Sequence, residues 1–158
     1  MLYFLHYLTD GGDVFNLFRY ITFRAGGAFF TSLVFGFLFS KPIINSLKRR
    51  QGEGQPIRED GPDSHKEQKA GTPTMGGVLI IGSLLVSSLL WCRYDIDYVW
   101  VVIFVTLGFG LIGFVDDYSK IRTRNSTGIS GKVRLALGLI IAAIATFWVI
   151  NIQDPMLS

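Results

Sequence analysis

The chain has 158 residues, of which 49% are hydrophobic and 17% are charged, with a formal net charge of +3. At a mean hydropathy of +0.40, this composition excludes an ordinary soluble domain of the same size and predicts an integral membrane protein. The positive charge does not indicate nucleic-acid binding, because the basic residues lie in the connections between apolar segments. Cys92 is the single cysteine, so no disulfide can form within the chain.

Four uncharged runs predict an all-α, polytopic fold with four transmembrane helices, because each is close to the roughly 20 residues that cross about 30 Å of hydrocarbon. We expect one transmembrane domain over residues 1–158, with spans at 22–44, 72–92, 98–117 and 134–153 and loops at 45–71 and 118–133. The aromatic segment 1–20 is expected to lie at the membrane interface. No cleavable signal peptide is expected, since the apolar start lacks a basic residue.

The distribution of lysine and arginine predicts the orientation of the chain in the membrane. The connection between the second and third spans carries one basic residue, Arg93, beside Asp95 and Asp97. The other two connections hold the remaining basic clusters, namely Lys48, Arg49, Arg50, Arg58, Lys66 and Lys69, and Lys120, Arg122, Arg124, Lys132 and Arg134. By the positive-inside rule these two connections are cytoplasmic, and both termini face outward.

A polar corner precedes the second span. Thr72 is placed to cap the second helix and Pro73 to occupy its first position, so free backbone N–H groups point toward the cytoplasm. With Lys69 and the Thr74 hydroxyl beside them, these groups form a candidate phosphate-binding corner. The alternative is an ordinary capped helix start with glycines for packing.

The third span ends in two adjacent carboxylates, Asp116 and Asp117. Acidic side chains at the C-terminal end of a helix oppose its macrodipole, so the pair is expected to cost stability there. Paired carboxylates are typical of sites for a divalent cation, a phosphate-bearing substrate or a proton; the alternative is that they only mark where the helix leaves the bilayer. Lys120 can meet both on one helix face, and an anion corner opposite a carboxylate pair suits metal-assisted phosphoryl chemistry.

Two stretches resemble a known family. Residues 58–77, which end in Gly-Thr-Pro-Thr-Met-Gly-Gly, and residues 113–118 closely resemble the phospho-N-acetylmuramoyl-pentapeptide-transferase (MraY) family, within the polyprenyl-phosphate sugar-1-phosphate transferase superfamily. Residues 20–25 and 127–132 also look like that family, so the resemblance runs over nearly the whole chain.

The resemblance implies a multi-pass enzyme of the bacterial inner membrane, with its active site facing the cytoplasm, that acts in peptidoglycan synthesis and hence in cell-wall biogenesis, cell shape and cell division. It would transfer phospho-MurNAc-pentapeptide from UDP-MurNAc-pentapeptide to undecaprenyl phosphate, with Mg²⁺, giving lipid I and UMP. A homodimer is left open, and no nucleic acid is implied.

The family's site residues carry over by position. Asp116 and Asp117 match its first aspartate pair, as catalytic residues that either bind Mg²⁺ or act on a proton, and Asp116 is a candidate to deprotonate or position the lipid phosphate. Lys69 is carried over as a third catalytic residue. The substrate-binding residues are Thr74, Lys120 and Lys132.

The chain also departs from the family, whose members have roughly ten transmembrane helices. The sequence matches only the N-terminal part and lacks a later Mg²⁺-binding aspartate and a histidine-rich motif, so the chain alone is expected to be inactive. Two alternatives are a related UDP-HexNAc:polyprenyl-phosphate HexNAc-1-phosphate transferase and a non-catalytic four-helix membrane protein that binds anionic lipids or a partner. A transporter is disfavoured, because none of the four runs has an internal charge.

Overall fold

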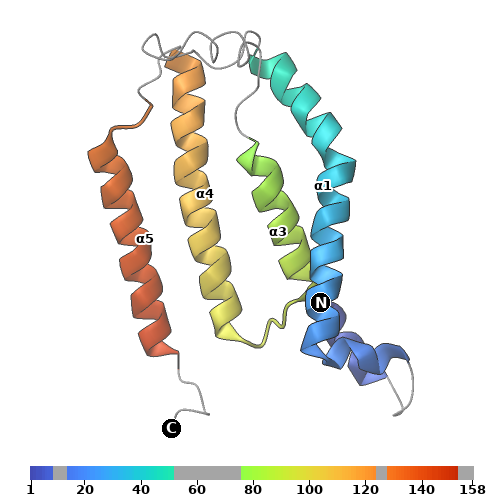
Figure 1. Ribbon diagram of the computed structural model, residues 1–158. Coiled ribbons are helices and arrows are strands. Elements are labelled where there is room, and N and C mark those ends of the chain that lie inside the picture. The colour runs from blue at the N-terminus through green and yellow to red at the C-terminus, as the bar shows by residue number, and fades with distance from the viewer. Residues whose placement is uncertain (9–13, 52–75, 124–127, 153–158) are drawn as a thin grey trace.

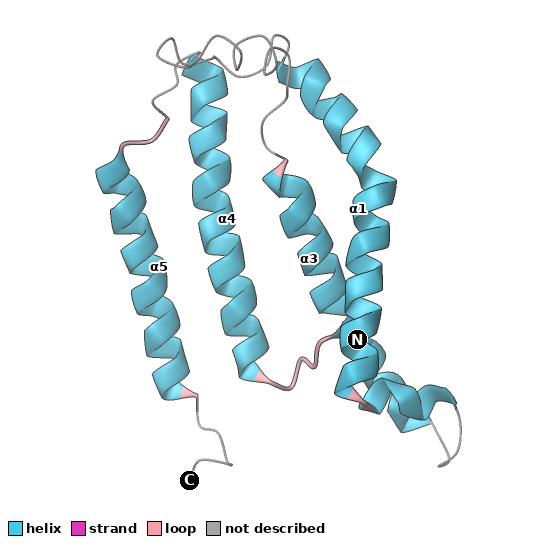
Figure 2. Ribbon diagram, in the orientation of Figure 1, coloured by secondary structure: helices cyan, strands magenta, loops and turns pink. Residues whose placement is uncertain are grey.

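The computed structural model describes residues 1–8, 14–51, 76–123 and 128–152, and all regular structure in these residues is helical. Two short 3₁₀ helices, η1 (Leu2–Leu8) and η2 (Val14–Arg19), come first. The α-helices of the described residues follow (Figures 1 and 2): α1 (Ile21–Gln51), α3 (Gly77–Trp91), α4 (Asp97–Thr123) and α5 (Gly131–Asn151).

The α-helices stand side by side in a row, in the order α1, α3, α4 and α5 (Figure 1), and each packs against its neighbour in that row. The chain's N-terminus and the last turn of α5 lie at the same end of the helix axes, where α3 also connects to α4. The opposite end carries the last turn of α4 and the first turn of α5. This opposite end is where the candidate site forms.

Three helices of the described residues are long and apolar enough to cross a membrane. They cover Ile21–Arg49, Asp97–Thr123 and Gly131–Asn151, and an 18-residue stretch within each has a mean hydropathy of 1.6, 2.3 and 2.3, respectively. α3 is also apolar but has 15 residues, and the predicted second span 72–92 begins outside the described residues. The predicted all-helical membrane fold is confirmed, whereas the count of four spans stays a prediction.

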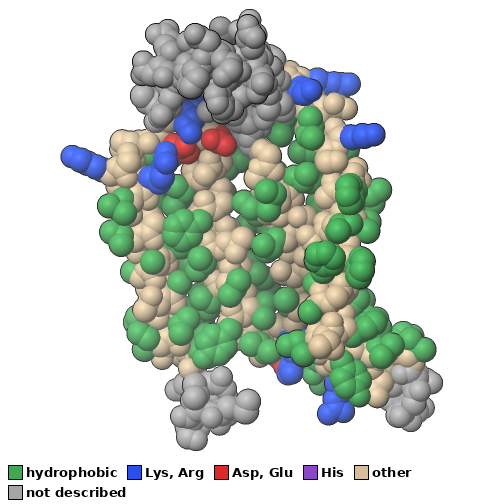
Figure 3. Space-filling view, viewed as in Figure 1, with side chains coloured by type: hydrophobic (Ala, Val, Ile, Leu, Met, Phe, Trp, Pro, Cys, Tyr) green, Lys and Arg blue, Asp and Glu red, His purple; other side chains and the backbone are tan. Residues whose placement is uncertain are grey.

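The outer surface of the row is apolar, as hydrocarbon requires. Hydrophobic side chains cover the middle of the molecule, and charged side chains gather at its two ends (Figure 3). Phe37 is 76% exposed and Ile150 is 75% exposed, although both lie in the middle or second half of long helices. Exposure of this kind is unfavourable in water and neutral in lipid.

α1 and α3 meet at a glycine. A side chain on Gly27 would overlap the Trp91 ring, so the indole packs directly on the α1 backbone. Its Nε1–H group donates a hydrogen bond of 2.9 Å to Thr31 Oγ1, one helical turn further along α1. The indole also stacks on Phe18 and meets Phe23 edge to face. Small residues thus permit the close approach that membrane helices use for packing.

The other two helix pairs of the row also meet at glycines. A Cβ atom at Gly110 of α4 would lie 2.5 Å from Ile81 of α3, and one at Gly108 would lie 2.8 Å from Ile141 of α5. The two glycines lie on different faces of α4, so this helix has close neighbours on both sides. α4 is therefore the centre of the part of the row that carries the site.

The third span was expected to end in the carboxylate pair, and this expectation is wrong for the helix itself. α4 continues to Thr123, and its last turn carries Lys120 and Arg122. Cations in the last turn of a helix interact favourably with its dipole, and the dipole effect is confined to that turn. Asp116 and Asp117 precede the last turn, so the dipole destabilises their negative charge only slightly. α1 likewise continues past the predicted limit at residue 44 to Gln51.

The N-terminal segment packs at the end of the helix axes that is farther from the site. The ring of Tyr3 is buried between two guanidinium groups, with the Cζ atom of Arg24 at 4.9 Å and that of Arg93 at 4.6 Å from its centroid. η1 also contacts η2 and α3. These contacts tie the segment to the helices, and its place at a membrane interface stays a prediction.

Candidate functional site

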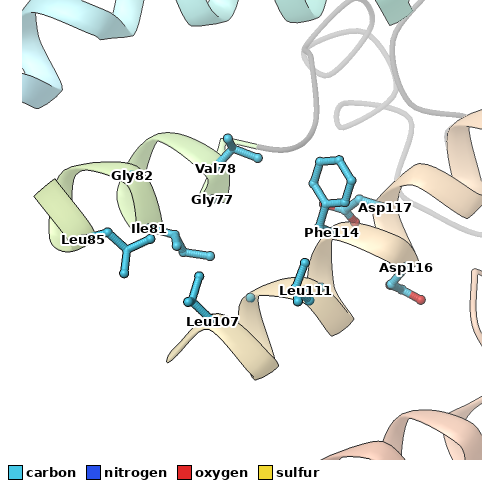
Figure 4. Close-up of a pocket in the computed structure, with 12 residues that line it drawn as sticks. Gly77, Val78, Ile81, Gly82, Leu85, Leu107, Leu111, Phe114, Asp116 and Asp117 are labelled. Atoms are coloured by element: carbon cyan, nitrogen blue, oxygen red, sulfur yellow. The ribbon is translucent and has the colours of Figure 1, made fainter. Parts of the chain in front are cut away.

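The two adjacent carboxylates of α4 have different surroundings. Asp116 is buried, with 6% of the residue exposed, whereas the side chain of Asp117 is 35% exposed. In Figure 4 the Asp116 side chain points away from α3, and that of Asp117 lies on the α3 side of the helix. Neighbouring residues of a helix point about 100° apart, so one carboxylate faces α5 and the other faces α3.

Asp116 accepts hydrogen bonds through both of its oxygens. Its Oδ1 atom accepts from the backbone N–H of Ile129 at 2.8 Å and from Nη2 of Arg134 at 2.7 Å. Its Oδ2 atom lies 2.7 Å from Nζ of Lys120, four residues later in α4. The predicted contact of Asp116 with Lys120 is therefore present. Bonds between an ionised acceptor and ionised donors are short and strong, so this carboxylate is held firmly.

Gly128 makes the contact with Ile129 sterically feasible. Its φ of +58° is left-handed, a region that side chains strain, and a Cβ atom there would overlap Asp116 Oδ1 and lie 2.8 Å from Cε of Lys120. Only glycine lets the backbone come this close to the carboxylate. The described end of the connection to α5, residues 128–130, thus fits closely around Asp116.

Arg134 enters the site from the first turn of α5. Ser130 caps that helix by accepting from the backbone N–H of Val133 at 3.4 Å, which fixes where the helix starts. From the sequence, Arg134 was counted only as an orientation signal, and Gly128 was not singled out. The visible signal was a Gly-Ile-Ser connection leading into a helix with an arginine in its first turn.

Asp117 borders an apolar groove between α3 and α4 (Figure 4) of about 460 Å³. Ile81 of α3 and Leu107 of α4 point toward one another across it. The groove is lined by Gly77, Val78, Ile81, Gly82, Leu85, Leu107, Gly110, Leu111, Gly113, Phe114, Asp116 and Asp117. Among the described lining residues, Asp116 and Asp117 are the acidic ones, and they lie at one end of the groove.

Lys120 links the two carboxylates. Its Nζ atom lies 2.7 Å from Asp116 Oδ2 and 3.6 Å from Asp117 Oδ1. Within the described part of the chain, this longer contact is the one polar interaction of the Asp117 carboxylate. Asp117 thus keeps most of its capacity to accept hydrogen bonds or a cation.

The structure places the remaining predicted site residues unevenly. Lys69 and Thr74, and the predicted cap at Thr72, lie outside the described residues. The described part of α3 begins at Gly77 after Gly76, which has no capping side chain. Lys132 is exposed in the first turn of α5 and has no ion pair with any residue that the structure describes. Asp116, Asp117 and Lys120 are therefore the predicted residues that come together.

The donor set decides how Mg²⁺ would fit. Three or more potential metal-ligand side chains do not cluster anywhere in the described ranges. Mg²⁺ at phosphate sites is usually bound through one or two carboxylates, with the remaining ligands from substrate phosphates and water. Asp117 fits as one such ligand. Asp116, as arranged here, would have to give up Lys120, Arg134 or Ile129 first.

Comparisons with known proteins agree on one family. The family model described as "Phospho-N-acetylmuramoyl-pentapeptide-transferase signature 1" matches residues 69–81, which include Lys69, Thr74 and the start of α3. The chain is also similar to proteins named phospho-N-acetylmuramoyl-pentapeptide-transferase from three bacteria. The identity is 66% over 148 residues in Ruegeria pomeroyi, 64% over 148 in Ruegeria sp. TM1040 and 63% over 145 in Dinoroseobacter shibae.

These matches cover 94%, 94% and 92% of this chain but 41%, 41% and 40% of the respective relatives. The chain thus spans about two fifths of the length of the curated relatives that it matches. Its described residues contain three helices able to cross a membrane, and together with these bacterial relatives they indicate a membrane-integral bacterial protein. With the signature at residues 69–81 and high identity to named transferases along nearly its entire length, the chain is similar to phospho-N-acetylmuramoyl-pentapeptide-transferases.

Proposed function

We propose that the chain contributes part of the site at which phospho-MurNAc-pentapeptide passes from UDP-MurNAc-pentapeptide to undecaprenyl phosphate, giving lipid I and UMP. The observation that carries this proposal is the position of Asp117, a half-exposed carboxylate at one end of an apolar groove, with a lysine ammonium 3.6 Å away. A polyprenyl phosphate needs both an apolar wall for its chain and a polar end for its phosphate. The names of the similar proteins point to the same reaction.

The chemistry assigns simple tasks to these residues. An oxygen of the lipid phosphate forms a bond to the sugar-linked phosphorus, and the bond from that phosphorus to the UMP oxygen breaks. Lys120 offers a cation to the crowded phosphate oxygens, and Asp117 is the carboxylate placed to hold Mg²⁺. Mg²⁺ bound there would neutralise phosphate charge. Lys69, Thr74 and Lys132 are proposed to bind the phosphates of the substrates.

The proposal includes an orientation. The chain crosses the bacterial inner membrane four times, with the end that carries Asp117 in the cytoplasm and both termini outside. Two features support it: the basic residues Lys120, Arg122 and Arg134 lie at the site end, and the N-terminus lies at the other end with the end of α5. The second span needs residues before Gly77, as the predicted range 72–92 provides.

The chain alone is proposed to be inactive, because the matching relatives are more than twice as long and a complete site has to surround two substrates. The test is a chimera in which this chain replaces the matching 148-residue segment of the Ruegeria pomeroyi relative. The chimera is purified from a strain depleted of its own transferase. Formation of a lipid-linked product is measured with labelled UDP-MurNAc-pentapeptide and with UDP-GlcNAc.

Product from UDP-MurNAc-pentapeptide in the chimera, and none from the 158-residue chain, is the expected result. Product from UDP-GlcNAc only would replace the proposal with the related HexNAc-1-phosphate transferase. A folded chimera that uses neither substrate would favour the non-catalytic membrane protein. Activity of the purified chain by itself would disprove the proposal that its site is incomplete.

A further inference from the structure

We propose that Arg24 binds the phosphate of an anionic phospholipid, such as phosphatidylglycerol, whose acyl chain lies in an apolar groove along α1. This lipid site is at the end of the helix axes that is farther from Asp117, in the membrane leaflet on that side. It consists of Arg24 and the groove residues Phe30, Thr31, Val34, Phe35, Leu38 and Phe39. The proposal concerns a surface outside the transfer site and goes beyond the proposed function.

Arg24 is a cation without an acceptor in the described part of the chain. It is half-buried in the first turn of α1, and its Nε–H group is buried without a hydrogen-bond partner there. Its guanidinium group instead stacks on the Tyr3 ring, with the Cζ atom 4.9 Å from the ring centroid. A charged donor without a partner is costly at a partly buried position. An anion at Arg24 would remove that cost.

The surroundings of Arg24 carry surplus positive charge among the described residues. Arg93 lies over the same Tyr3 ring, with its Cζ atom at 4.6 Å, but Arg93 is paired with Asp95. Arg24 acts on the Asp95 carboxylate only over a longer distance, without a direct contact. One carboxylate thus faces two guanidinium groups. This imbalance favours a phosphate, because a guanidinium can donate two parallel hydrogen bonds to phosphate oxygens.

Aromatic rings at this end of the helices indicate the depth of Arg24 in the membrane. Ring contacts connect Tyr3, Phe4, Tyr94 and Trp100 into one group. Tyrosine and tryptophan are enriched at the level of lipid headgroups. Since Arg24 stacks on Tyr3 of this group, we place its guanidinium at the depth of the lipid phosphates.

The groove along α1 fits the acyl chain of the same lipid. It has a volume of about 340 Å³, and its lining is apolar except for Thr31. Residues 30–39 extend about 14 Å along the helix axis, which is roughly half of the 30 Å thickness of the hydrocarbon and thus the depth of one leaflet. Arg24 and Thr31 are seven residues apart, so they point to nearly the same side of α1. A headgroup at Arg24 therefore directs its chain into the groove.

Trp91 can report whether the groove is occupied, because its indole packs on Gly27 and bonds to Thr31, which lines the groove. Trp100 and Trp148 are changed to Phe, so Trp91 is the one indole left. The chain is placed in phosphatidylcholine vesicles with rising fractions of phosphatidylglycerol or phosphatidylcholine whose acyl chains carry bromine, which quenches nearby indoles. Half-maximal quenching should need about tenfold less brominated phosphatidylglycerol than brominated phosphatidylcholine. Equal quenching by the two lipids would overturn the proposal.

Variants of Arg24 test the headgroup contact. Arg24→Gln should abolish the preference for phosphatidylglycerol, and Arg24→Lys should weaken it several-fold, because an ammonium lacks the paired donors. Arg19→Gln is the matched control, since Arg19 is an exposed arginine at the end of η2, and should keep the preference. Circular dichroism checks that each variant stays helical. If Arg24→Gln does not fold, Arg24→Lys decides, and a full preference in a folded Arg24 variant would refute the contact.

Two further comparisons separate a lipid from a soluble phosphate ester. Val34→Phe fills the groove and should weaken quenching by brominated phosphatidylglycerol, whereas Leu33→Phe, at a neighbouring position outside the lining, should not. Glycerol 3-phosphate, which has no acyl chain, should leave the quenching unchanged. If it displaced the brominated lipid, Arg24 would belong to a site for soluble phosphate esters. If Val34→Phe had no effect, the acyl chain would not lie in this groove.

Discussion

The Nη2 atom of Arg134 lies 2.7 Å from Oδ1 of Asp116, although 18 residues separate the two in the sequence. The same oxygen accepts from Ile129 in the connection between the helices. One carboxylate oxygen therefore holds both the connection and the first turn of α5. Near the site, the ion pair of Asp116 with Arg134 joins α4 to α5. In the apolar part of the two helices, they meet through contacts such as that of Gly108 with Ile141.

Gly128→Ala should destabilise the chain by about 1–3 kcal/mol, because a side chain at a φ of +58° is strained and also overlaps Asp116. The measurement is thermal or denaturant unfolding in detergent, followed by circular dichroism. Gly36→Ala is the matched control, since a Cβ atom there meets nothing within 4 Å. Equal stability of the two variants would contradict the close fit of the connection around the carboxylate.

Gly27→Ala should separate α1 from α3 and lower stability by about 1–3 kcal/mol, because a methyl group there forces the Trp91 ring away from its hydrogen bond with Thr31. Indole fluorescence should report the displaced ring in the same samples. Gly26→Ala tests the neighbouring position, where a Cβ atom has open space, and should change neither signal. A neutral Gly27→Ala would show that the helices do not pack this closely.

Asp117→Asn in the chimera should lower kcat by about 10²-fold and raise the Mg²⁺ concentration needed for half-maximal rate, because a neutral amide binds the cation poorly. Its unfolding should resemble that of the parent, since the Asp117 carboxylate makes one polar contact, at 3.6 Å, within the described residues. Asp116→Asn should clearly lose stability, because Asp116 is buried and accepts from three donors at 2.7–2.8 Å. An unchanged Mg²⁺ requirement in Asp117→Asn would remove Asp117 as a ligand of the cation.

The connection between α3 and α4 should make stability depend on pH in acid. Arg93 donates hydrogen bonds to Asp95 and holds the pKa of that carboxyl below its usual 3.8. Because the folded pKa is depressed, the pair contributes above pH 3.8, and this contribution is lost as the pH falls through the lower folded pKa.

The contribution of this pair should be below about 1 kcal/mol, because both side chains are more than a third exposed to solvent. Unfolding of the parent and of Asp95→Asn is measured between neutral pH and pH 3. The stability difference between them should shrink as the pH falls below 3.8. A difference that stays constant over this range would remove the ion pair as its cause.

The sequence predicted what depends on spacing within one helix. Apolar runs of the right length revealed the membrane fold, and the interval of four residues between Asp116 and Lys120 predicted their contact. These features depend on local spacing and not on contacts between different helices.

The sequence did not predict the features that depend on contacts between different helices. Arg134 reaches Asp116 only because the connection turns at Gly128, and a left-handed glycine looks like any other glycine in a sequence. The end of α4 was also placed too early, because the change from apolar to charged residues marks a change of solvent, not the end of hydrogen bonding along the helix. Lys120 and Arg122 instead support the final turn.

The order of the helices in the row has a consequence for biogenesis. α1, α3, α4 and α5 lie side by side in the order in which the ribosome makes them (Figure 1). Each helix entering the bilayer finds its partner already there, as the last one inserted. Among these four helices no earlier pair has to open to admit a later one, so this part of the row can grow at one edge, one helix at a time, while translation continues.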